Sequence, residues 1–291
     1  MPLVRHRGLP APLAFAASPP PAWGFGGLVT EGAVQADDVA LVLSDLAQLP
    51  FLQLSIRPNP LEAAIWQDAA ARSPFLKLPR RAHVLDLSGG FDTVWKKRFN
   101  HTARKSVRKA EKAGLVVECD TTGRLIPVYY DLYLQSLGQW ARQQNEPPWL
   151  ARWRGERRDP MSKIQNMATY LQEDFRLWVA WLGGEPIVAM IVLQGGNNAH
   201  VTRTVMNRAL AGPVRANVLL ESLAIEDACR AGDRYYHMGE SGASASLAQF
   251  KEQFGAQPYD YAEYRLERLP LTRLDSSLRA GVKRLIGFRD R

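Results

Sequence analysis

The sequence predicts a mixed α/β fold with a mixed sheet, built from two tandem halves. Its 291 residues exceed the roughly 100–200 residues usual for one domain. Hydrophobic residues make up 46% of the chain and charged residues 23%, which is the balance of a globular protein. Helical and strand-like segments are interleaved without the regular alternation of a parallel sheet. We therefore predict halves at 1–121 and 122–268, followed by a helix at 269–291.

The first half carries helix and strand signals in alternation. The acidic pair Asp37 and Asp38 suits the positive start of a helix. Gly89 and Gly90 precede a second helix, and Gly114 is a suitable stop for it. The predicted elements are a helix from Asp37 to Leu46, strands at 52–56 and 84–87, a helix from Asp92 to Ala113, and a strand at 115–119.

The second half begins with a helix and continues as an antiparallel meander. Gly183-Gly184 and Gly195-Gly196 separate three short apolar runs, as hairpin turns do. Pro213 is placed as a helix start and Gly232 as its end. Residues 145–159 show no period and are predicted as a loop over the cleft. The other elements are helices at 125–144, 213–232 and 247–254, and strands at 177–182, 187–193, 200–206, 235–238 and 259–266.

Composition limits the chemistry. Cys119 and Cys229 lie in no Cys/His cluster, so no metal site is predicted. No apolar run approaches the roughly 18 residues of a membrane span, and we expect a cytoplasmic protein. The formal net charge of +8 indicates a protein that attracts anions, whether nucleic acid, phosphorylated cofactors or acidic membrane surfaces.

Two short motifs carry a family resemblance. They are Thr102–Gly114 (TARKSVRKAEKAG) and Gln249–Gly255 (QFKEQFG), with Phe25-Gly26-Gly27 as an early glycine-rich turn. In this order they resemble the Fem family of peptidoglycan-bridge aminoacyltransferases and their acyltransferase relatives in the GNAT superfamily. The resemblance implies two GNAT-like domains that share a cleft and that form an amide by acyl transfer.

The first motif is strongly basic. Helical spacing stacks like charges that repel each other, so an anionic partner would relieve a cost. We predict a phosphate track for tRNA or for a diphosphate group; the alternative is an ordinary solvated face. The predicted contacts are Arg104, Lys105, Arg108, Lys109 and Lys112.

The second motif supplies the predicted catalytic lysine. The resemblance places Lys251 near the acyl-transfer site, where its ammonium would stabilise charge on the carbonyl oxygen, with Phe250 beside the donor. Glu240 is predicted to accept the proton of the attacking amine; His237, of opposite strand parity, is the alternative. A solvated lysine and a structural hydrogen bond are the other interpretations of these residues.

The donor site is predicted around the meander-to-helix turn and a small-residue loop. Arg203, Arg208 and Arg215 flank the turn where GNAT proteins bind the pyrophosphate of coenzyme A, and Ser241 and Ser244 lie in the loop. The glycine spacing after Arg208 departs from the acetyl-CoA signature, which weakens the coenzyme A hypothesis. No Ser/His/Asp constellation is legible, so direct attack by the amine is predicted.

The acceptor is predicted to lie at the glycine-rich turn, with Phe25, Gly26, Gly27 and Trp140 as contacts. Trp149 and Trp153 could extend an aromatic wall, although packing is the other interpretation. The C-terminal helix is basic and amphipathic, which suits docking on its own domain or contact with a membrane surface.

Together these patterns predict an N-acyltransferase. The leading donor is aminoacyl-tRNA, with an acyl-CoA as the alternative and no tightly bound cofactor. The predicted acceptor is an amine of a peptidoglycan precursor or of a peptide-like natural product. A hypothesis from another class is a non-catalytic module that binds RNA or a membrane surface through the same basic helix.

Overall fold

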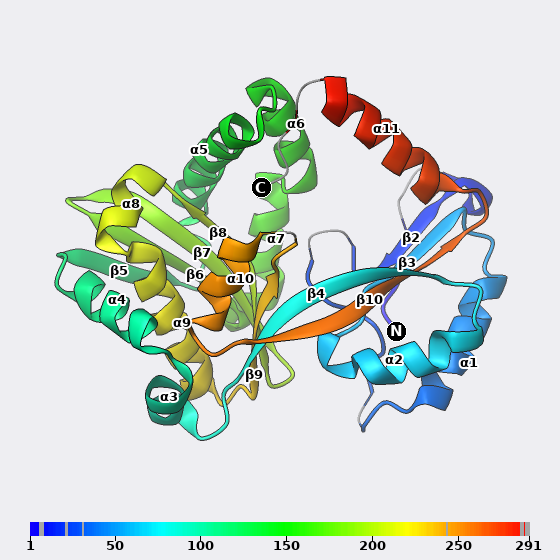
Figure 1. Cartoon of the computed structure of the whole chain (residues 1–291), viewed down its shortest axis with the longest axis horizontal. Helices are drawn as coiled ribbons and strands as arrows, with labels where there is room; N and C mark the ends of the chain where they lie inside the picture. Colours follow the sequence, from blue (N-terminus) through cyan, green and yellow to red (C-terminus); the bar gives the residue numbers. More distant parts are fainter. Residues whose placement is uncertain (6–8, 21–22, 31, 243, 286–287, 289–291) are drawn as a thin grey trace. The chain divides into compact units, whose positions relative to one another are not determined.

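The protein is described by a computed structural model that covers residues 1–5, 9–20, 23–30, 32–242, 244–285 and 288. The chain forms two compact units (Figure 1). Unit 1 comprises Met1–Ala82 and Pro258–Leu285, and the main part of unit 2 is His83–Gln257. The predicted domain limits at 121 and 268 do not coincide with this division and stay a prediction. The basic helix belongs to unit 2 because it packs against a helix of the second half.

Unit 1 carries a mixed sheet with the strand order β1-β2-β3-β10-β4 among its described residues. Strand β2 pairs parallel with β3, whereas β10 pairs antiparallel with β3, with Tyr264 opposite Ile56. The elements are β1 (Val4–Arg5), β2 (Phe15–Ser18), α1 (Ala36–Gln48), β3 (Gln53–Ile56), α2 (Ala63–Ala69), β4 (Leu76–Asp86), β10 (Gln257–Glu267) and α11 (Leu271–Leu285).

The core of unit 1 forms between this sheet and helices α1 and α2. The alternating residues Leu54 and Ile56 point inward, together with Leu43 of α1. Trp66 of α2 is fully buried, and its ring centroid lies 5.6 Å from that of Tyr264. A capping box of Gln35 and Asp38 starts α1, as the acidic pair in the sequence indicates.

Unit 2 carries a sheet with the order β4-β9-β8-β7-β6-β5, in which β4 contributes residues from His83 onward. The strands β6 to β8 form the predicted antiparallel meander. Strand β5, predicted as part of the first half, pairs antiparallel with β6, and β9 joins β8 in parallel. The elements are α3 (Gly90–Thr93), a π-helical turn (Val94–Arg98), α4 (His101–Glu111), β5 (Leu115–Asp120), α5 (Ile126–Gln144), α6 (Pro148–Arg158), α7 (Met161–Leu171), β6 (Phe175–Leu182), β7 (Glu185–Gly195), β8 (Asn198–Met206), α8 (Arg208–Val214), α9 (Ala216–Ala231), β9 (Tyr235–Glu240) and α10 (Ala245–Glu252).

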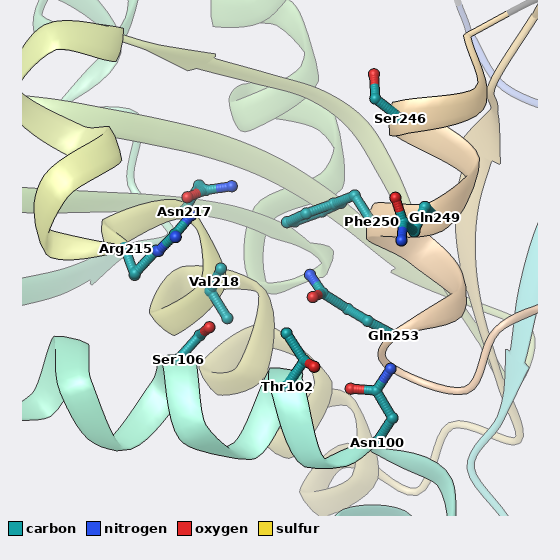
Figure 2. A pocket seen from close by; sticks show the side chains of 10 residues that line it. All are labelled: Asn100, Thr102, Ser106, Arg215, Asn217, Val218, Ser246, Gln249, Phe250 and Gln253. Atoms are coloured by element: carbon teal, nitrogen blue, oxygen red, sulfur yellow. The ribbon is translucent and has the colours of Figure 1, made fainter.

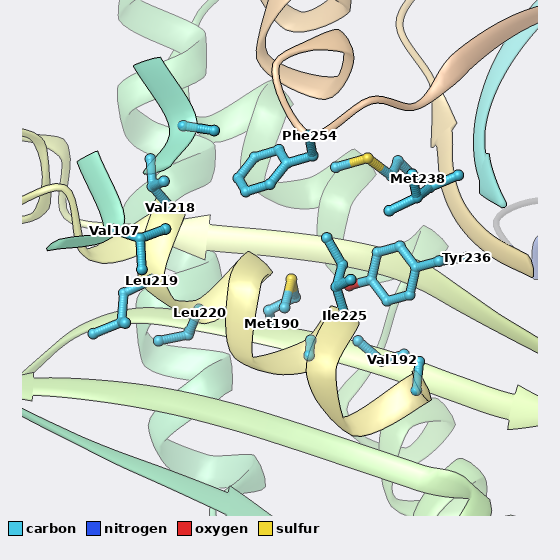
Figure 3. Close-up of a cluster of buried hydrophobic side chains, with 14 of the residues drawn as sticks. Val107, Met190, Val192, Val218, Leu219, Leu220, Ile225, Tyr236, Met238 and Phe254 are labelled. Atoms are coloured by element: carbon cyan, nitrogen blue, oxygen red, sulfur yellow. The ribbon is translucent and has the colours of Figure 1, made fainter. Parts of the chain in front are cut away.

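Strand β7 lies in the middle of three layers and is buried on both faces. Its residues Val188, Met190 and Val192 pack into the cluster formed with α4 and α9, part of which Figure 3 shows. Ala189 and Ile191 pack on the opposite side, in the cluster formed with α5 and α7. A continuous apolar run of this length is what burial on both faces requires. The predicted mixed α/β class is confirmed.

The prediction of a loop at 145–159 is wrong, because Pro148–Arg158 forms helix α6. Pro148 occupies the first turn, where a missing N–H costs nothing. The helix packs on α5 through the small residues Ala151 and Gly155, and a Cβ at Gly155 would collide with Leu137. A contact face made of small residues leaves no apolar period in the sequence, so the helix was missed.

Two helix starts also differ from the prediction. The segment from Asp92 to Ala113 is interrupted at Asn100, whose side chain caps α4 by accepting from Ala103 N at 2.9 Å. Pro213 lies inside the short helix α8, and α9 begins after Arg215, which adopts φ 58°. A strong N-cap residue and a left-handed residue thus set boundaries that apolar spacing alone does not mark.

The predicted terminal helix is present as α11 from Leu271 to Leu285. Residues 286–291 of that prediction, apart from 288, lie outside the described residues. Leu278 and Val282 are exposed on α11. Among the helices that the structure describes, none is long and apolar enough to cross a bilayer.

Candidate active site

The site begins where two neighbouring strands of unit 2 stop pairing. Strands β8 and β9 are paired only from Asn198 and Tyr235 to His200 and His237. Beyond this point Val201–Thr204 and Met238–Glu240 line a cavity of about 880 Å³. Gly239 turns the end of β9 with φ 72°, a conformation that glycine adopts without strain. The opened sheet therefore exposes strand backbone at the wall of a cavity.

Lys251 lies in the wall of this cavity and is only 4% exposed. It is held by α10, whose first turn is capped by Ser244. Its Nζ donates to the carbonyl oxygens of Gly239 and Glu240, each at 2.8 Å. Burial lowers the pKa of Lys251 to about 8, against the opposing effect of Glu221 and Glu240. An ammonium carries three N–H donors, so one is left for a ligand in the cavity.

Glu221 was missed by the sequence analysis. It lies on α9, is 3% exposed, and lines the same cavity. Burial raises its pKa to about 7, with Tyr236 and Lys251 acting in the opposite direction. Within the described residues neither its Oε1 nor the Tyr236 hydroxyl reaches hydrogen-bonding geometry. A charged residue inside the apolar run from Val218 to Ile225 was the signal that could have identified it.

The structure distinguishes the two predicted proton acceptors by position. Glu240, the last residue of β9, lines the cavity. His237 lies where β8 and β9 still pair; its Nε2 is 2.9 Å from Asn198 Oδ1. Burial and the neighbouring His200 lower the pKa of His237 to about 3, so it stays neutral. The role of Glu240 as a base stays a prediction.

The predicted donor residues all line this cavity, but several have protein partners. Arg203 pairs with Asp159 at 3.0 Å, and Arg208 donates to Gln143 at 3.2 Å. Arg215 is exposed and lines this cavity and a smaller neighbouring one. Phe250, Ser241 and Ser244 complete the predicted set in the cavity wall.

Ser241 lies beside a histidine that the sequence alone does not connect with it. Its Oγ lies 3.1 Å from Nδ1 of His83, a residue distant in the sequence and fully buried on β4. The other ring nitrogen of His83 lies 3.4 Å from Glu252 Oε1. Sequence separations of 158 and 169 residues hid these contacts from the sequence analysis, and direct attack by the amine stays a prediction.

A smaller cavity of about 340 Å³ opens between α4, α9 and α10 (Figure 2). It shares Arg215, Asn217, Ser246 and Phe250 with the larger cavity, so the two adjoin. The wall contributed by α4 is polar and uncharged. The remaining lining residues are Asn100, Thr102, Ser106, Val218, Gln249 and Gln253.

The basic helix α4 lies beside this smaller cavity, but its cations do not line it. Arg104 is half-buried and donates to backbone carbonyls of Trp95, Lys96 and Phe99, which satisfies the end of the preceding turn. A structural role is thus visible for Arg104. The other predicted phosphate contacts are exposed, namely Lys105, Arg108, Lys109 and Lys112.

The predicted acceptor residues are divided between the units. Trp140 lines the larger cavity in unit 2, whereas Phe25, Gly26 and Gly27 belong to unit 1. Gly26 packs so closely on the Ser18–Pro19 backbone that a Cβ would lie 2.6 Å from Pro19 N. This close packing accounts for a glycine at position 26, and no bound ligand is needed to explain it. Among the described residues no group of three or more His, Cys, Asp or Glu side chains could hold a metal ion.

Two strands that part beside a cavity, in a sheet with helices on both faces, are typical of the GNAT class of acyltransferases. The sequence matches the acetyltransferase (GNAT) domain family over residues 97–259, and the chain belongs to that family. The protein is therefore an acyltransferase. No curated protein sequence matches the chain.

Two solved structures share the fold over nearly the whole chain. FemX is similar with a TM-score of 0.64 and 12% identity, over 94% of this chain and 85% of FemX. L-PGS from Bacillus licheniformis is similar with a TM-score of 0.53 and 14% identity, over 99% of this chain and 87% of that one. The predicted resemblance to the Fem-like branch of GNAT proteins is confirmed at the level of the fold.

Proposed function

We propose that the protein transfers an aminoacyl group from aminoacyl-tRNA to an amine and forms an amide. The observation that carries this proposal is Lys251, a buried cation with one N–H left for the cavity beside two carboxyl groups. Acyl transfer needs a donor that stabilises charge on the carbonyl oxygen and a base that takes the proton of the amine. Lys251 suits the first role. Glu240 suits the second, and Glu221, whose pKa is about 7, is a further candidate.

Helix α8 favours tRNA over a coenzyme A thioester as the donor. The resemblance assigns this segment to pyrophosphate binding, which uses free backbone N–H groups. Here Ala209 N donates to the Asn207 side chain, and Ala211 N to the Asn207 carbonyl. Pro213 has no N–H, and Arg215 N donates to Gly212. Few donors are left for a pyrophosphate, whereas exposed cations on α4 suit a tRNA backbone.

The similarity in fold to FemX and L-PGS is compatible with an aminoacyl donor. We propose a peptide-like or peptidoglycan-precursor amine as the acceptor, bound from the side of Trp140. We further propose that the reaction takes place in the cytoplasm, where aminoacyl-tRNA is available.

The donor proposal is tested by binding of mixed aminoacyl-tRNA, and separately of acetyl-CoA, across a salt series. The test variant carries Lys105→Ala, Arg108→Ala and Lys109→Ala. The matched control removes three exposed cations elsewhere: Arg72, Lys77 and Arg230. Loss of three phosphate contacts should lower the slope of log affinity against log salt by about 2 to 3. The control should keep the slope, and binding of acetyl-CoA alone would overturn the tRNA proposal.

Transfer itself is tested by detecting amide formation on supplied amines. If Lys251→Ala and Glu240→Ala abolish the product while tRNA binding persists, a binding-only module is ruled out. If the wild-type protein binds tRNA and forms no amide with any acceptor, the binding module becomes the better interpretation.

A further inference from the structure

Two tryptophans are exposed on one helix of unit 2. Trp149 is 71% exposed and Trp153 is 54% exposed, and both lie on α6. Their spacing of four residues places them on the same side of the helix. The opposite side, with Ala151 and Gly155, is buried against α5 (Figure 1). The two indole rings therefore face solvent and are not part of a packed core.

Arginines surround this pair of tryptophans. Helix α6 contains four arginines and one glutamate, and all four arginines are exposed. Arg157 follows Trp153 by one helical turn, and its Cζ lies 5.6 Å from the centroid of the Trp153 ring. Helical geometry places Arg152 and Arg154 on the two flanks of this row. The outer side of α6 is therefore both aromatic and cationic.

The acids beside α6 neutralise only part of this charge. Three arginines have carboxylate partners at 2.8 to 3.0 Å, namely Arg152 with Glu156, Arg154 with Glu146, and Arg158 with Asp159. Within the part of the chain that the structure describes, no carboxylate forms an ion pair with Arg157. The pair of Arg152 with Glu156 is exposed and contributes little, so that arginine can exchange its partner for another anion. An anionic surface thus meets cations beside two large apolar rings.

The combination of tryptophan and arginine on one helix side suits the surface of a lipid bilayer. Tryptophan rings settle at the level of the lipid headgroups, and arginines pair there with phosphate groups. Single-stranded nucleic acid, which also binds aromatic and cationic side chains, is held in a groove. Residues of α6 line neither of the two described cavities, and the tryptophans lie on the outer, convex side of the helix. A flat anionic surface fits this shape better than a strand of nucleic acid does.

We propose that the outer side of α6 docks the protein on an anionic lipid bilayer. Trp149 and Trp153 insert at the headgroup level, and the arginines of α6 contact lipid phosphates. This inference goes beyond the proposed transfer and does not depend on it. The docking is peripheral and reversible, because two rings bury only a small apolar area. A protein held in this way meets amines that are anchored in the same bilayer at a raised local concentration.

The test is cosedimentation of the full chain with large unilamellar vesicles. One set contains phosphatidylcholine and phosphatidylglycerol in equal amounts, and the other contains phosphatidylcholine alone. We expect binding to the mixed vesicles that weakens with added salt. Trp149→Ala combined with Trp153→Ala should lower the partition coefficient about tenfold or more, because both rings lose their apolar contact with lipid. The matched control, Leu41→Ala with Tyr170→Ala, removes two exposed apolar side chains of other helices and should leave binding unchanged.

A second variant tests the charge. Arg152→Gln combined with Arg157→Gln should lower binding to the mixed vesicles about tenfold or more, since each arginine near an anionic surface contributes roughly a fivefold factor. Circular dichroism should show the wild-type fold in both variants, because all four side chains are exposed. Wild-type vesicle binding by the tryptophan variant, or equal binding of the wild-type protein to the two vesicle types, would overturn the proposal. So would loss of RNA binding in the tryptophan variant with vesicle binding intact.

The measurement contains neither donor nor amine, so it stands apart from the proposed function. If the vesicles do not bind, the proposed transfer is untouched and the docking surface is wrong. If vesicle binding requires Trp149 and Trp153 but no amide forms with any donor, the docking stands and the proposed transfer fails.

Discussion

Two buried glutamates, Glu263 in unit 1 and Glu221 in unit 2, have opposite surroundings. Glu263 in unit 1 is 2% exposed and accepts from Ser55 and from the guanidinium groups of Arg57, Arg80 and Arg265. These partners lower its pKa to about 2. Glu221 in unit 2 is 3% exposed, and its pKa is raised to about 7.

The difference separates a carboxylate with a structural role from a carboxyl group whose protonation can change near neutral pH. A buried carboxylate surrounded by guanidinium groups fixes strands together and has no reason to change protonation near neutral pH. A buried carboxyl group without that compensation is costly, and such costs concentrate at functional sites. Lys251 belongs with Glu221, because burial also moves its pKa toward neutrality, to about 8. The comparison therefore supports the proposal that the chemistry takes place in unit 2.

The largest expected effect is loss of transfer on removing the buried cation. Lys251→Met should lower kcat/KM about 100-fold or more, because one donor to a developing oxyanion contributes about that factor. Lys77→Met, at an exposed lysine of unit 1, is the control and should leave the rate unchanged. Product formation is measured at equal folded fractions, checked by circular dichroism. A wild-type rate in Lys251→Met would break the assignment of the chemistry to this cavity.

The next effect is on stability and concerns unit 1. Glu263→Ala should lower the free energy of unfolding by about 3 kcal/mol, since it leaves three arginines without their shared partner. Asp260→Ala breaks the exposed pair with Arg81 and should cost at most about 0.5 kcal/mol. Urea unfolding measures both. If Glu263→Ala is as stable as the control, Glu263 does not have the structural role assigned to it here.

The two acids should also respond to pH in opposite directions. The pKa of Glu263 is lowered from 4.5, so its stabilisation is full above pH 4.5 and is lost as pH falls toward 2. The pKa of Glu221 is raised from 4.5 to about 7, so its contribution is lost as pH rises from 4.5 through 7.

Urea midpoints of Glu263→Gln and Glu221→Gln between pH 3 and 8 test this contrast. Destabilisation by Glu263→Gln should shrink toward pH 3. Glu221→Gln should gain stability relative to the wild-type protein as pH rises to 7. Parallel pH profiles for the two variants would show that the surroundings do not differ as described.

The smallest expected effect concerns the hydroxyl of Tyr236, which lowers the pKa of Glu221 although it falls short of ideal hydrogen-bonding geometry within the described residues. Loss of this hydroxyl raises the pKa of Glu221. Tyr236→Phe should therefore move the acid limb of the kcat/KM profile to higher pH, by less than about one unit. Tyr264→Phe, at a buried tyrosine of unit 1, should not move it. A shift to lower pH in Tyr236→Phe would contradict the role of Glu221 in that limb.

The sequence predicts the fold better than the site. The regular spacing of apolar residues and the glycine pairs at turns locate the meander and most helices, because those signals are local in the sequence. Helix α6 was missed since Ala151 and Gly155, its contact residues, are small. Lys251 was found through a short motif, but Glu221 was not, because its meaning depends on burial. The contact of Ser241 with His83 is non-local and leaves no sequence pattern.

The pairing of β10 with β3 has a consequence during synthesis of the chain. Residues Gln53–Ile56 of β3 pair with Tyr264–Glu267 of β10, so unit 1 completes its sheet only after more than two hundred intervening residues have been made. The main part of unit 2 is continuous from His83 to Gln257 and can fold earlier on the ribosome. Until then Leu54 and Ile56 lack their cross-strand neighbours from β10, and this edge of the emerging first segment is exposed to aggregation or chaperone binding.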